Sequence, residues 1–278
     1  MKRAIVWFKT DLRLHDNETL VYALEHNDEV IPVYCFDEAH FAASNLGFAR
    51  MGSFRAQFLL EALADLDTSL RKLGSGLLIL RGKPEEALAK LALEKGIRRV
   101  FAKREVAIEE KQTQERVERE LWKVGCTLDT FSTSTLYHAE DLPFSIRDIP
   151  EIFTEFRKKA EKESGIRSVF AAPAAISSPY IPSMQLPALA ELGIAAAVPD
   201  VRAALSFKGG ESEGLKRVAY YFGSRLVGTY KETRNSMTGP DYSSKFSAWL
   251  SIGCLSARQI YHDLKLYEEQ HGANDSTY

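Results

Sequence analysis

Five short apolar runs decide the fold of this chain: AIVWF (4–8), EVIPVYCF (29–36), GLLILRG (76–82), RRVFAKR (98–104) and CTLDTFST (126–133). Each run is strand-like, and the runs are separated by amphipathic stretches whose apolar positions recur every three or four residues. One such stretch extends from Phe54 to Leu73 and ends at Gly74. Right-handed crossovers place connecting helices on both faces of a parallel sheet, so the alternation predicts a five-stranded, Rossmann-like α/β domain over residues 1–133.

The rest of the chain follows a different pattern. The periodicity fades from about 134 to 205, where the stretch APAAISSPYIPSMQLPALAELGIAAAVPD (172–200) holds five prolines that interrupt any helix. We therefore expect an interdomain connector over residues 134–205. Ser256 and Gln259 form a capping box for a helix over residues 257–270. Residues 206–278 are accordingly predicted to be a helical region.

Composition limits the classes of function. A formal net charge of −2 over 278 residues excludes a globally basic nucleic-acid binder and leaves room for a local basic patch. Cys35, Cys126 and Cys254 are far apart, which favours free buried thiols in a reducing compartment over a disulfide or a metal site. No window approaches the ~18 apolar residues that span a bilayer. We expect a cytoplasmic protein without membrane or metal.

The turn after the first strand reads KTDLRLHDN (9–17) and lacks the G-x-G-x-x-G of a standard dinucleotide site. Two interpretations stay open for its polar residues. They form a polar ligand cluster at the carboxyl edge of the sheet, or they cap a helix and hold the loop through an arginine–carboxylate pair. We assign no catalytic role to these residues, which are Asp11, Arg13, His15, Asp16 and Asn17.

A second polar segment, SSKFS (243–247), follows Tyr230 and Arg234. Hydroxyls and free backbone N–H groups at a helix start can satisfy phosphate oxygens, although a serine there can equally be a simple helix cap. Tyr230 and Arg234 are four residues apart and share one face if the segment is helical. The residues by themselves leave the phosphate site and the cap as alternatives.

The chain as a whole resembles the photolyase and cryptochrome family. The resemblance is carried by WFKTDLRLHDN (7–17), by FRAQFLLEALADLDTSLRKLGSGLLILRGKPEEAL (54–88) and by the segment from GGESEGLKRVAYYF (209–222) to the SARQIY motif (256–261). The pairs LYHAEDLPF with IFTEFRKKAE and YKETRN with YSSKFS resemble DASH-type cryptochromes within that family. These motifs occur in the expected order.

The resemblance implies a helical domain that binds FAD. In this family the position of Tyr230 contacts FAD, and Arg234 matches a position at the DNA-facing surface. The flavin phosphates and ribityl chain are surrounded by the positions of Ser243, Ser244, Lys245, Phe246 and Ser247. The implied activity is light-driven repair of cyclobutane pyrimidine dimers in single-stranded or locally opened DNA. The alternative is a blue-light photoreceptor that signals without repair.

The family also includes members with a folate antenna, 5,10-methenyltetrahydrofolate, near the segment that corresponds to KREVAIEE (103–110). Here Ala107 and Ile108 stand where polar residues are expected, which counts against a folate, although Glu105, Glu109 and Glu110 remain nearby.

In relatives the lesion pocket, further flavin contacts and the electron-transfer tryptophans follow the position of Tyr278. We therefore expect this chain alone to hold an incomplete FAD site and to be catalytically inactive. Its three tryptophans, Trp7, Trp122 and Trp249, are interpreted as packing residues. Apolar helix faces around Leu226, Phe246 and Leu266 are expected to be exposed and to cause self-association.

Overall fold

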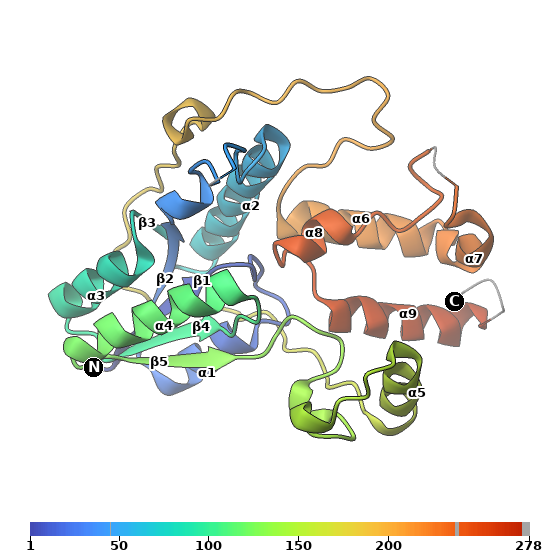
Figure 1. Cartoon of the computed structure of the whole chain (residues 1–278), viewed down its shortest axis with the longest axis horizontal. Coiled ribbons are helices and arrows are strands. Elements are labelled where there is room, and N and C mark those ends of the chain that lie inside the picture. The colour runs from blue at the N-terminus through green and yellow to red at the C-terminus, as the bar shows by residue number, and fades with distance from the viewer. Residues whose placement is uncertain (45, 237–238, 274–278) are drawn as a thin grey trace.

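A five-stranded parallel sheet occupies the N-terminal part of the chain, with the strand order β3-β2-β1-β4-β5 (Figure 1). The computed structural model describes residues 1–44, 46–236 and 239–273. The five predicted runs each form a strand, and neighbouring strands pair in parallel, so the expected sheet is confirmed. The strands are β1 (Arg3–Phe8), β2 (Glu29–Phe36), β3 (Leu78–Arg81), β4 (Arg99–Lys103) and β5 (Thr127–Phe131).

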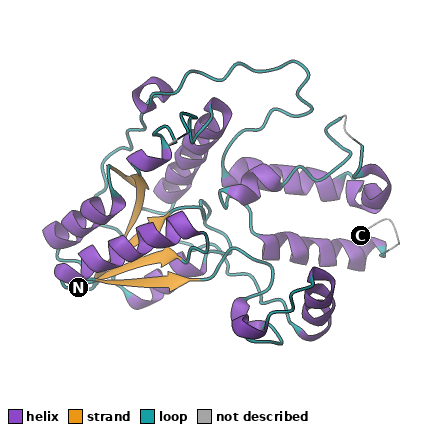
Figure 2. Cartoon of the chain, in the orientation of Figure 1, coloured by secondary structure: helices purple, strands orange, loops and turns teal. Residues whose placement is uncertain are grey.

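Helices cover both faces of this sheet because side chains alternate along the central strand. Ala4, Val6 and Phe8 pack in one apolar cluster with α1 and α2, whereas Ile5 and Trp7 pack in a second cluster with α3 and α4 (Figure 2). The four helices are α1 (Glu18–His26), α2 (Ser53–Lys72), α3 (Pro84–Lys95) and α4 (Ile108–Lys123).

Local signals set where several helices begin and end. The Asn17 side chain accepts a hydrogen bond of 3.1 Å from the Leu20 amide and so caps α1. Pro84 occupies the first turn of α3, and Gly96 ends that helix in the left-handed conformation. The Ser256 hydroxyl caps α9 (Ala257–His271), as predicted, but the Gln259 side chain bonds to Asp263 and does not complete the capping box.

The connector leaves β5, passes through α5 (Phe153–Glu163), returns beside the sheet and then arches past α2 to the helical segment (Figure 1). Its backbone pairs with the α/β domain on the way, for example through a hydrogen bond of 2.9 Å from the Val30 amide to the Ser177 carbonyl. The helical segment contains α6 (Glu211–Gly223), α7 (Tyr230–Thr233), α8 (Ser247–Ser251) and α9. Within the described residues, we find no helix with the length and apolarity that a membrane crossing requires.

The helical segment packs directly on the outer side of α2. The rings of Phe58 and Trp249 lie 6.0 Å apart in an edge-on arrangement. The backbone approaches so closely at Gly209 that an added Cβ would lie 1.9 Å from the Phe58 carbonyl oxygen. The apolar core of the sheet on the α1 and α2 side therefore continues without a break into the helical segment.

The tryptophans differ in their surroundings. Trp7 and Trp249 are buried, as expected for packing residues. Trp122 is 76% exposed at the end of α4, so its interpretation as a packing residue is wrong. The error has a simple cause, because an aromatic residue at the end of an amphipathic helix carries no signal of which face it occupies.

The three cysteines are free and buried, as the sequence indicates. Burial raises the pKa of Cys35 and of Cys254 to about 12, and that of Cys126 to about 11. Removal of the thiolate from water is the largest cause in each case.

We expect stability to fall as pH rises above 9, the ordinary pKa of a thiol. Between pH 9 and 10, below the ordinary pKa of tyrosine, the folded state keeps three thiol protons that the unfolded chain loses, so each thiol lowers the free energy of unfolding by about 1.4 kcal/mol per pH unit. Lys9 has the opposite effect. Burial lowers its pKa, so the folded state releases one proton at a lower pH than the unfolded chain does, which reduces the net slope by the contribution of one group. Urea unfolding at a series of pH values measures the slope. A Cys254→Ala variant with an unchanged slope would contradict the assignment.

Candidate functional site

The predicted phosphate-binding segment forms a loop over residues 240–247, here named the serine loop, that lies against α6. The Arg217 guanidinium, which is 8% exposed, donates hydrogen bonds to three carbonyl oxygens of this loop. The distances are 2.6 Å to Pro240, 3.2 Å to Ser243 and 3.0 Å to Ser244. Because the C=O and N–H of a trans peptide point in opposite directions, holding these carbonyls against α6 turns the following amides away from it.

Those amides are available. The backbone N–H groups of residues 243–247 have no hydrogen-bond acceptor among the residues that the structure describes. Lys245 has a left-handed backbone with φ of 62°, and Phe246, which follows it, is right-handed with φ of −73°. Successive left- and right-handed residues make neighbouring N–H groups converge, which is the geometry of a backbone nest for an anion. The serine loop thus fits a phosphate without any rearrangement of its own hydrogen bonds.

Polar side chains add to these amides. The hydroxyls of Ser243, Ser244 and Ser247 and the Lys245 amine have no hydrogen-bond or ion-pair partner among the described residues. The Phe246 side chain, by contrast, is buried and packs 5.4 Å from the Tyr221 ring, so only its backbone is offered to a ligand.

Tyr230 and Arg234 belong to the same turn of helix. The Arg234 amide donates to the Tyr230 carbonyl at 2.8 Å, so the two side chains share a face as predicted. Tyr221 links this turn to the serine loop, because it contacts Phe246 and belongs to the apolar cluster against which Tyr230 packs. Burial raises the pKa of Tyr221 to about 12, which keeps its hydroxyl neutral. The predicted site residues are therefore arranged around one side of α6, and Arg234 is exposed to solvent.

The polar loop at residues 10–17 holds the helical segment to the α/β domain. Asp16 is fully buried and accepts bonds of 2.6 Å and 3.0 Å from the Arg258 guanidinium, and it also accepts a bond from the Ser256 hydroxyl. Arg13 donates to the Gly253 carbonyl at 3.0 Å. Of the two interpretations left open by the sequence, the structure supports caps and a holding pair, although the pair joins the helical segment to the part of the chain that forms the sheet and does more than hold one loop.

A second contact completes this joint between the helical segment and the 10–17 loop. Glu211, the first residue of α6, accepts bonds from the Leu14 amide at 2.8 Å and from the His15 amide at 2.9 Å, and its carboxylate also contacts the His15 ring. The joint therefore fixes α6, α8 and α9 to the 10–17 loop. It also limits the movement of the serine loop, because the serine loop lies between α6 and α8 in the chain.

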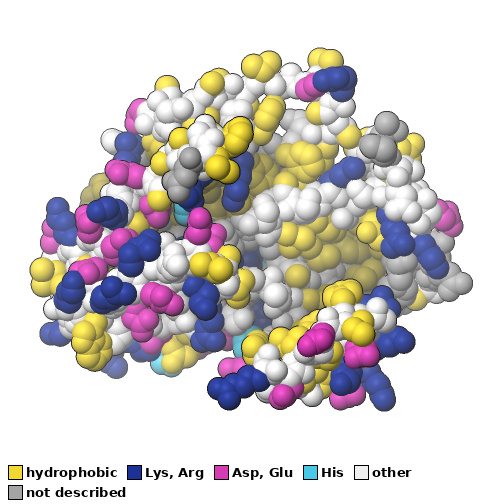
Figure 3. Space-filling model, in the orientation of Figure 1, with side chains coloured by type: hydrophobic (Ala, Val, Ile, Leu, Met, Phe, Trp, Pro, Cys, Tyr) yellow, Lys and Arg dark blue, Asp and Glu magenta, His cyan; other side chains and the backbone are white. Residues whose placement is uncertain are grey.

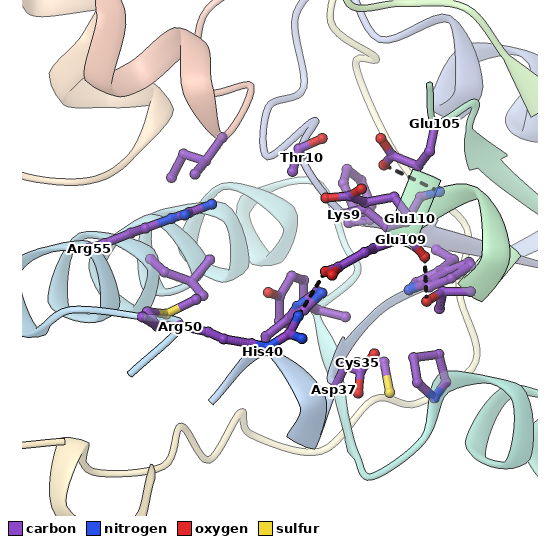
Figure 4. Close-up of a pocket in the computed structure, with 18 residues that line it drawn as sticks. Lys9, Thr10, Cys35, Asp37, His40, Arg50, Arg55, Glu105, Glu109 and Glu110 are labelled. Carbon is purple, nitrogen blue, oxygen red and sulfur yellow. Dashed lines mark hydrogen bonds and ion pairs between the residues drawn. The ribbon is translucent and has the colours of Figure 1, made fainter. Parts of the chain in front are cut away.

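A separate cavity of about 350 Å³ opens at the carboxyl edge of the sheet, where α/β folds place their ligands (Figure 4). Its wall combines the aromatic rings of Trp7 and Tyr34 with charged groups that follow the strand ends, and Ile252 of the helical segment contributes to it. Arg50 reaches across the mouth to the Glu109 carboxylate at 2.7 Å. The charged and polar lining residues are Lys9, Thr10, Asp37, His40, Arg50, Arg55, Glu105, Glu109, Glu110 and Thr113.

Lys9 is a largely buried cation in the wall of this cavity. Its Nζ lies 3.4 Å from Glu105 and 4.6 Å from the Trp7 ring centroid, without a hydrogen-bond partner in the described part of the chain. Burial lowers its pKa, although the Glu105 carboxylate opposes the shift. Sequence reasoning missed Lys9, Asp37 and Arg55 here. Lys9 and Asp37 directly follow the ends of β1 and β2, and that position is the signal that indicates a ligand site.

The segment expected to contact a folate lies on this cavity. Glu105, Glu109 and Glu110 line it, whereas Ala107 and Ile108 do not and are exposed. Because Ala107 and Ile108 lie outside the cavity wall, polar residues at these two positions would not contact a ligand in this cavity.

A groove of about 480 Å³ separates α6 from α9. Figure 3 shows apolar side chains gathered in the hollow between these helices. Leu266 on α9 is 54% exposed and Leu215 on α6 is 37% exposed, and Phe222 also lines the groove. The expected exposure of apolar helix faces is thus found around Leu266, whereas it is wrong for Phe246, which is buried, and Leu226 is only partly exposed.

Comparison with known proteins gives a consistent result. The family model for DNA photolyase matches residues 4–176. A cryptochrome DASH of Gloeobacter violaceus is 46% identical over 279 residues, which cover 100% of this chain and 56% of the relative. The chain spans about half the length of the curated relatives that it matches.

Solved structures agree. The crystal structure of a Synechocystis cryptochrome superposes with a TM-score of 0.95 at 41% identity and covers 100% of this chain and 58% of that protein. A class III photolyase of Agrobacterium tumefaciens superposes with a TM-score of 0.82 at 26% identity, covering 100% and 55% respectively. By its sequence and its fold, the chain belongs to the DNA photolyase and cryptochrome family, as a DASH-type member.

Proposed function

We propose that this chain is the N-terminal half of a DASH-type photolyase that uses FAD and light to split cyclobutane pyrimidine dimers in single-stranded or locally opened DNA. The observation that carries the proposal is the serine loop, whose amides are turned outward by Arg217 and have no acceptor in the described structure. Members of this family bind FAD, and the loop fits the phosphates of such a cofactor. We also propose the domain division 1–133, 134–205 and 206–278.

Each residue has a defined task in this proposal. The amides of residues 243–247 and the hydroxyls of Ser243, Ser244 and Ser247 bind the flavin phosphates, and the Lys245 amine adds positive charge. Tyr230 contacts the cofactor from the neighbouring turn. The bound flavin would supply the electron for dimer splitting. Arg234, exposed beside Tyr230, would bind a DNA backbone phosphate.

The cavity at the edge of the sheet supports a second, smaller proposal. Its aromatic wall and the unsatisfied Lys9 amine suit a planar heteroaromatic ligand with a carbonyl oxygen, such as a folate antenna. We also propose a cytoplasmic location, because three unpaired thiols are typical of a protein in a reducing compartment.

Photorepair assays test the main proposal. A protein of the relatives' full length that contains this sequence is expected to repair dimers in a single strand under blue light, and better than in a duplex, where unstacking costs more. Arg234→Ala should weaken DNA binding and make it less salt-dependent, whereas Arg202→Ala, an exposed arginine on the connector, should not. Absence of repair on both substrates would favour the alternative, a photoreceptor cryptochrome. We expect the 278-residue chain alone to be inactive.

The chain alone is expected to self-associate through the groove between α6 and α9, because the apolar side chains of this groove are partly exposed to water. Leu266→Glu should shift the population toward monomer in light scattering. Leu93→Glu, which changes a leucine on α3 that is even more exposed, at 66%, should not. A monodisperse monomer for the unmodified chain would contradict the expectation.

A further inference from the structure

We propose that Arg217 is a positioning residue for the phosphate-binding amides of the serine loop. The identity of the ligand rests on the function proposed above. The orienting effect of Arg217 on the loop does not, because it follows from the contacts of Arg217 alone. All three carbonyls that it binds, those of Pro240, Ser243 and Ser244, belong to the serine loop. A buried guanidinium has a rigid, planar set of donors, so it fixes the orientation of several peptides at once.

The fixed peptides are those that a ligand would use. The Ser243 carbonyl shares its peptide with the Ser244 amide, and the Ser244 carbonyl shares its peptide with the Lys245 amide. Each carbonyl bound by Arg217 therefore directs one amide to the opposite, open side of the loop. The third amide group of the nest, that of Phe246, follows the left-handed Lys245. Without the guanidinium, these peptides would be free to rotate, and the entropic cost of ordering them would fall on ligand binding.

Neighbouring groups hold the guanidinium itself in place. Arg217 lies 3.6 Å from an Asp241 oxygen, and its centre is 5.2 Å from the Tyr220 ring. The Tyr220 hydroxyl donates to the other Asp241 oxygen at 3.2 Å. These contacts leave the orientation of Arg217 well determined. They also place a cation directly behind the amides, where it favours an anion on the open side.

The test separates positioning from simple stability. Arg217→Lys keeps the positive charge but loses the planar set of N–H donors, and Arg217→Met removes both. Lys216→Ala, which breaks an exposed pair with Glu213 on the same helix, is the matched control. We expect backbone NMR order parameters at residues 243–246 to fall in Arg217→Met, to fall less in Arg217→Lys, and to stay unchanged in the control, while those of α2 stay constant in all three.

Titration with pyrophosphate and with FAD, followed through the same amide signals, supplies the second readout. Saturable shifts are expected in the unmodified chain, and affinity about tenfold weaker in Arg217→Met, the loss that one or two charge-assisted hydrogen bonds would cause. In Arg217→Ala, added guanidinium should restore the order of the loop, and methylammonium should not.

The outcomes distinguish the two proposals. Rigid loop amides in Arg217→Met would overturn the positioning role, and so would a loss of order that spreads equally to α2. If the unmodified chain binds neither probe while the order parameters still fall in the variants, Arg217 positions the loop as proposed and the phosphate-binding function of that loop in this chain is wrong.

Discussion

Replacement of Gly253 by alanine is expected to lower the free energy of unfolding by about 2 to 5 kcal/mol. Two costs add. Gly253 has φ of +71°, a conformation that costs a non-glycine residue about 1–2 kcal/mol. In addition, an added Cβ would lie 2.1 Å from the Thr10 carbonyl oxygen, and such overpacking costs about 1–3 kcal/mol. Urea unfolding measured by circular dichroism provides the value.

Gly193→Ala is the matched control, because Gly193 has the same φ of +71° and nothing within 4 Å of the added Cβ. It should show the conformational cost alone, about 1–2 kcal/mol. Equal losses in the two variants would mean that the close contact between Gly253 and the 10–17 loop is not formed in solution.

Asp16→Asn should have a similarly large effect, a loss of about 3–5 kcal/mol. The carboxylate is fully buried and pairs with the buried Arg258, so its removal leaves an uncompensated cation in the interior. The control is Asp200→Asn, which breaks an exposed pair with Arg202 at the same distance of 2.6 Å. Water screens that pair, and we expect no measurable change.

A double replacement sharpens this second prediction. If the loss in Asp16→Asn comes from the unpaired charge, Asp16→Asn combined with Arg258→Met should recover part of it. A double variant no more stable than Asp16→Asn alone would indicate that the hydrogen bonds to the loop, and not the buried charge, account for the loss. The serine loop should also lose order in Asp16→Asn, since the joint fixes α8 and α9.

The sheet and most of the helix boundaries could be predicted from local signals. The five apolar runs, the cap at Asn17 and the proline that starts α3 each act within a few residues, so the sequence displays them directly. The serine loop was also identified, although its residues alone left a helix cap as an alternative. Trp122 was misplaced, because an aromatic residue at the end of an amphipathic helix gives no signal of which face it occupies.

The role of the 10–17 loop could not be predicted from its residues. Asp16 and Arg258 are 242 residues apart, and no local pattern in either segment indicates the other. The same holds for Arg217, which the helical pattern of α6 presents as an ordinary charged residue and which the fold places beneath three carbonyls of the serine loop.

Sequence by itself therefore determined the strands, most helix ends, the family and the position along the chain of the segment that we propose to bind phosphate, because each of these depends on neighbouring residues or on a motif. Only the tertiary structure decided which side of the serine loop carries free amides, which polar loop joins the domains, and where the cavity at the sheet edge lies. These features depend on contacts between segments far apart in the chain, and such contacts form only when both segments bury their polar groups against each other.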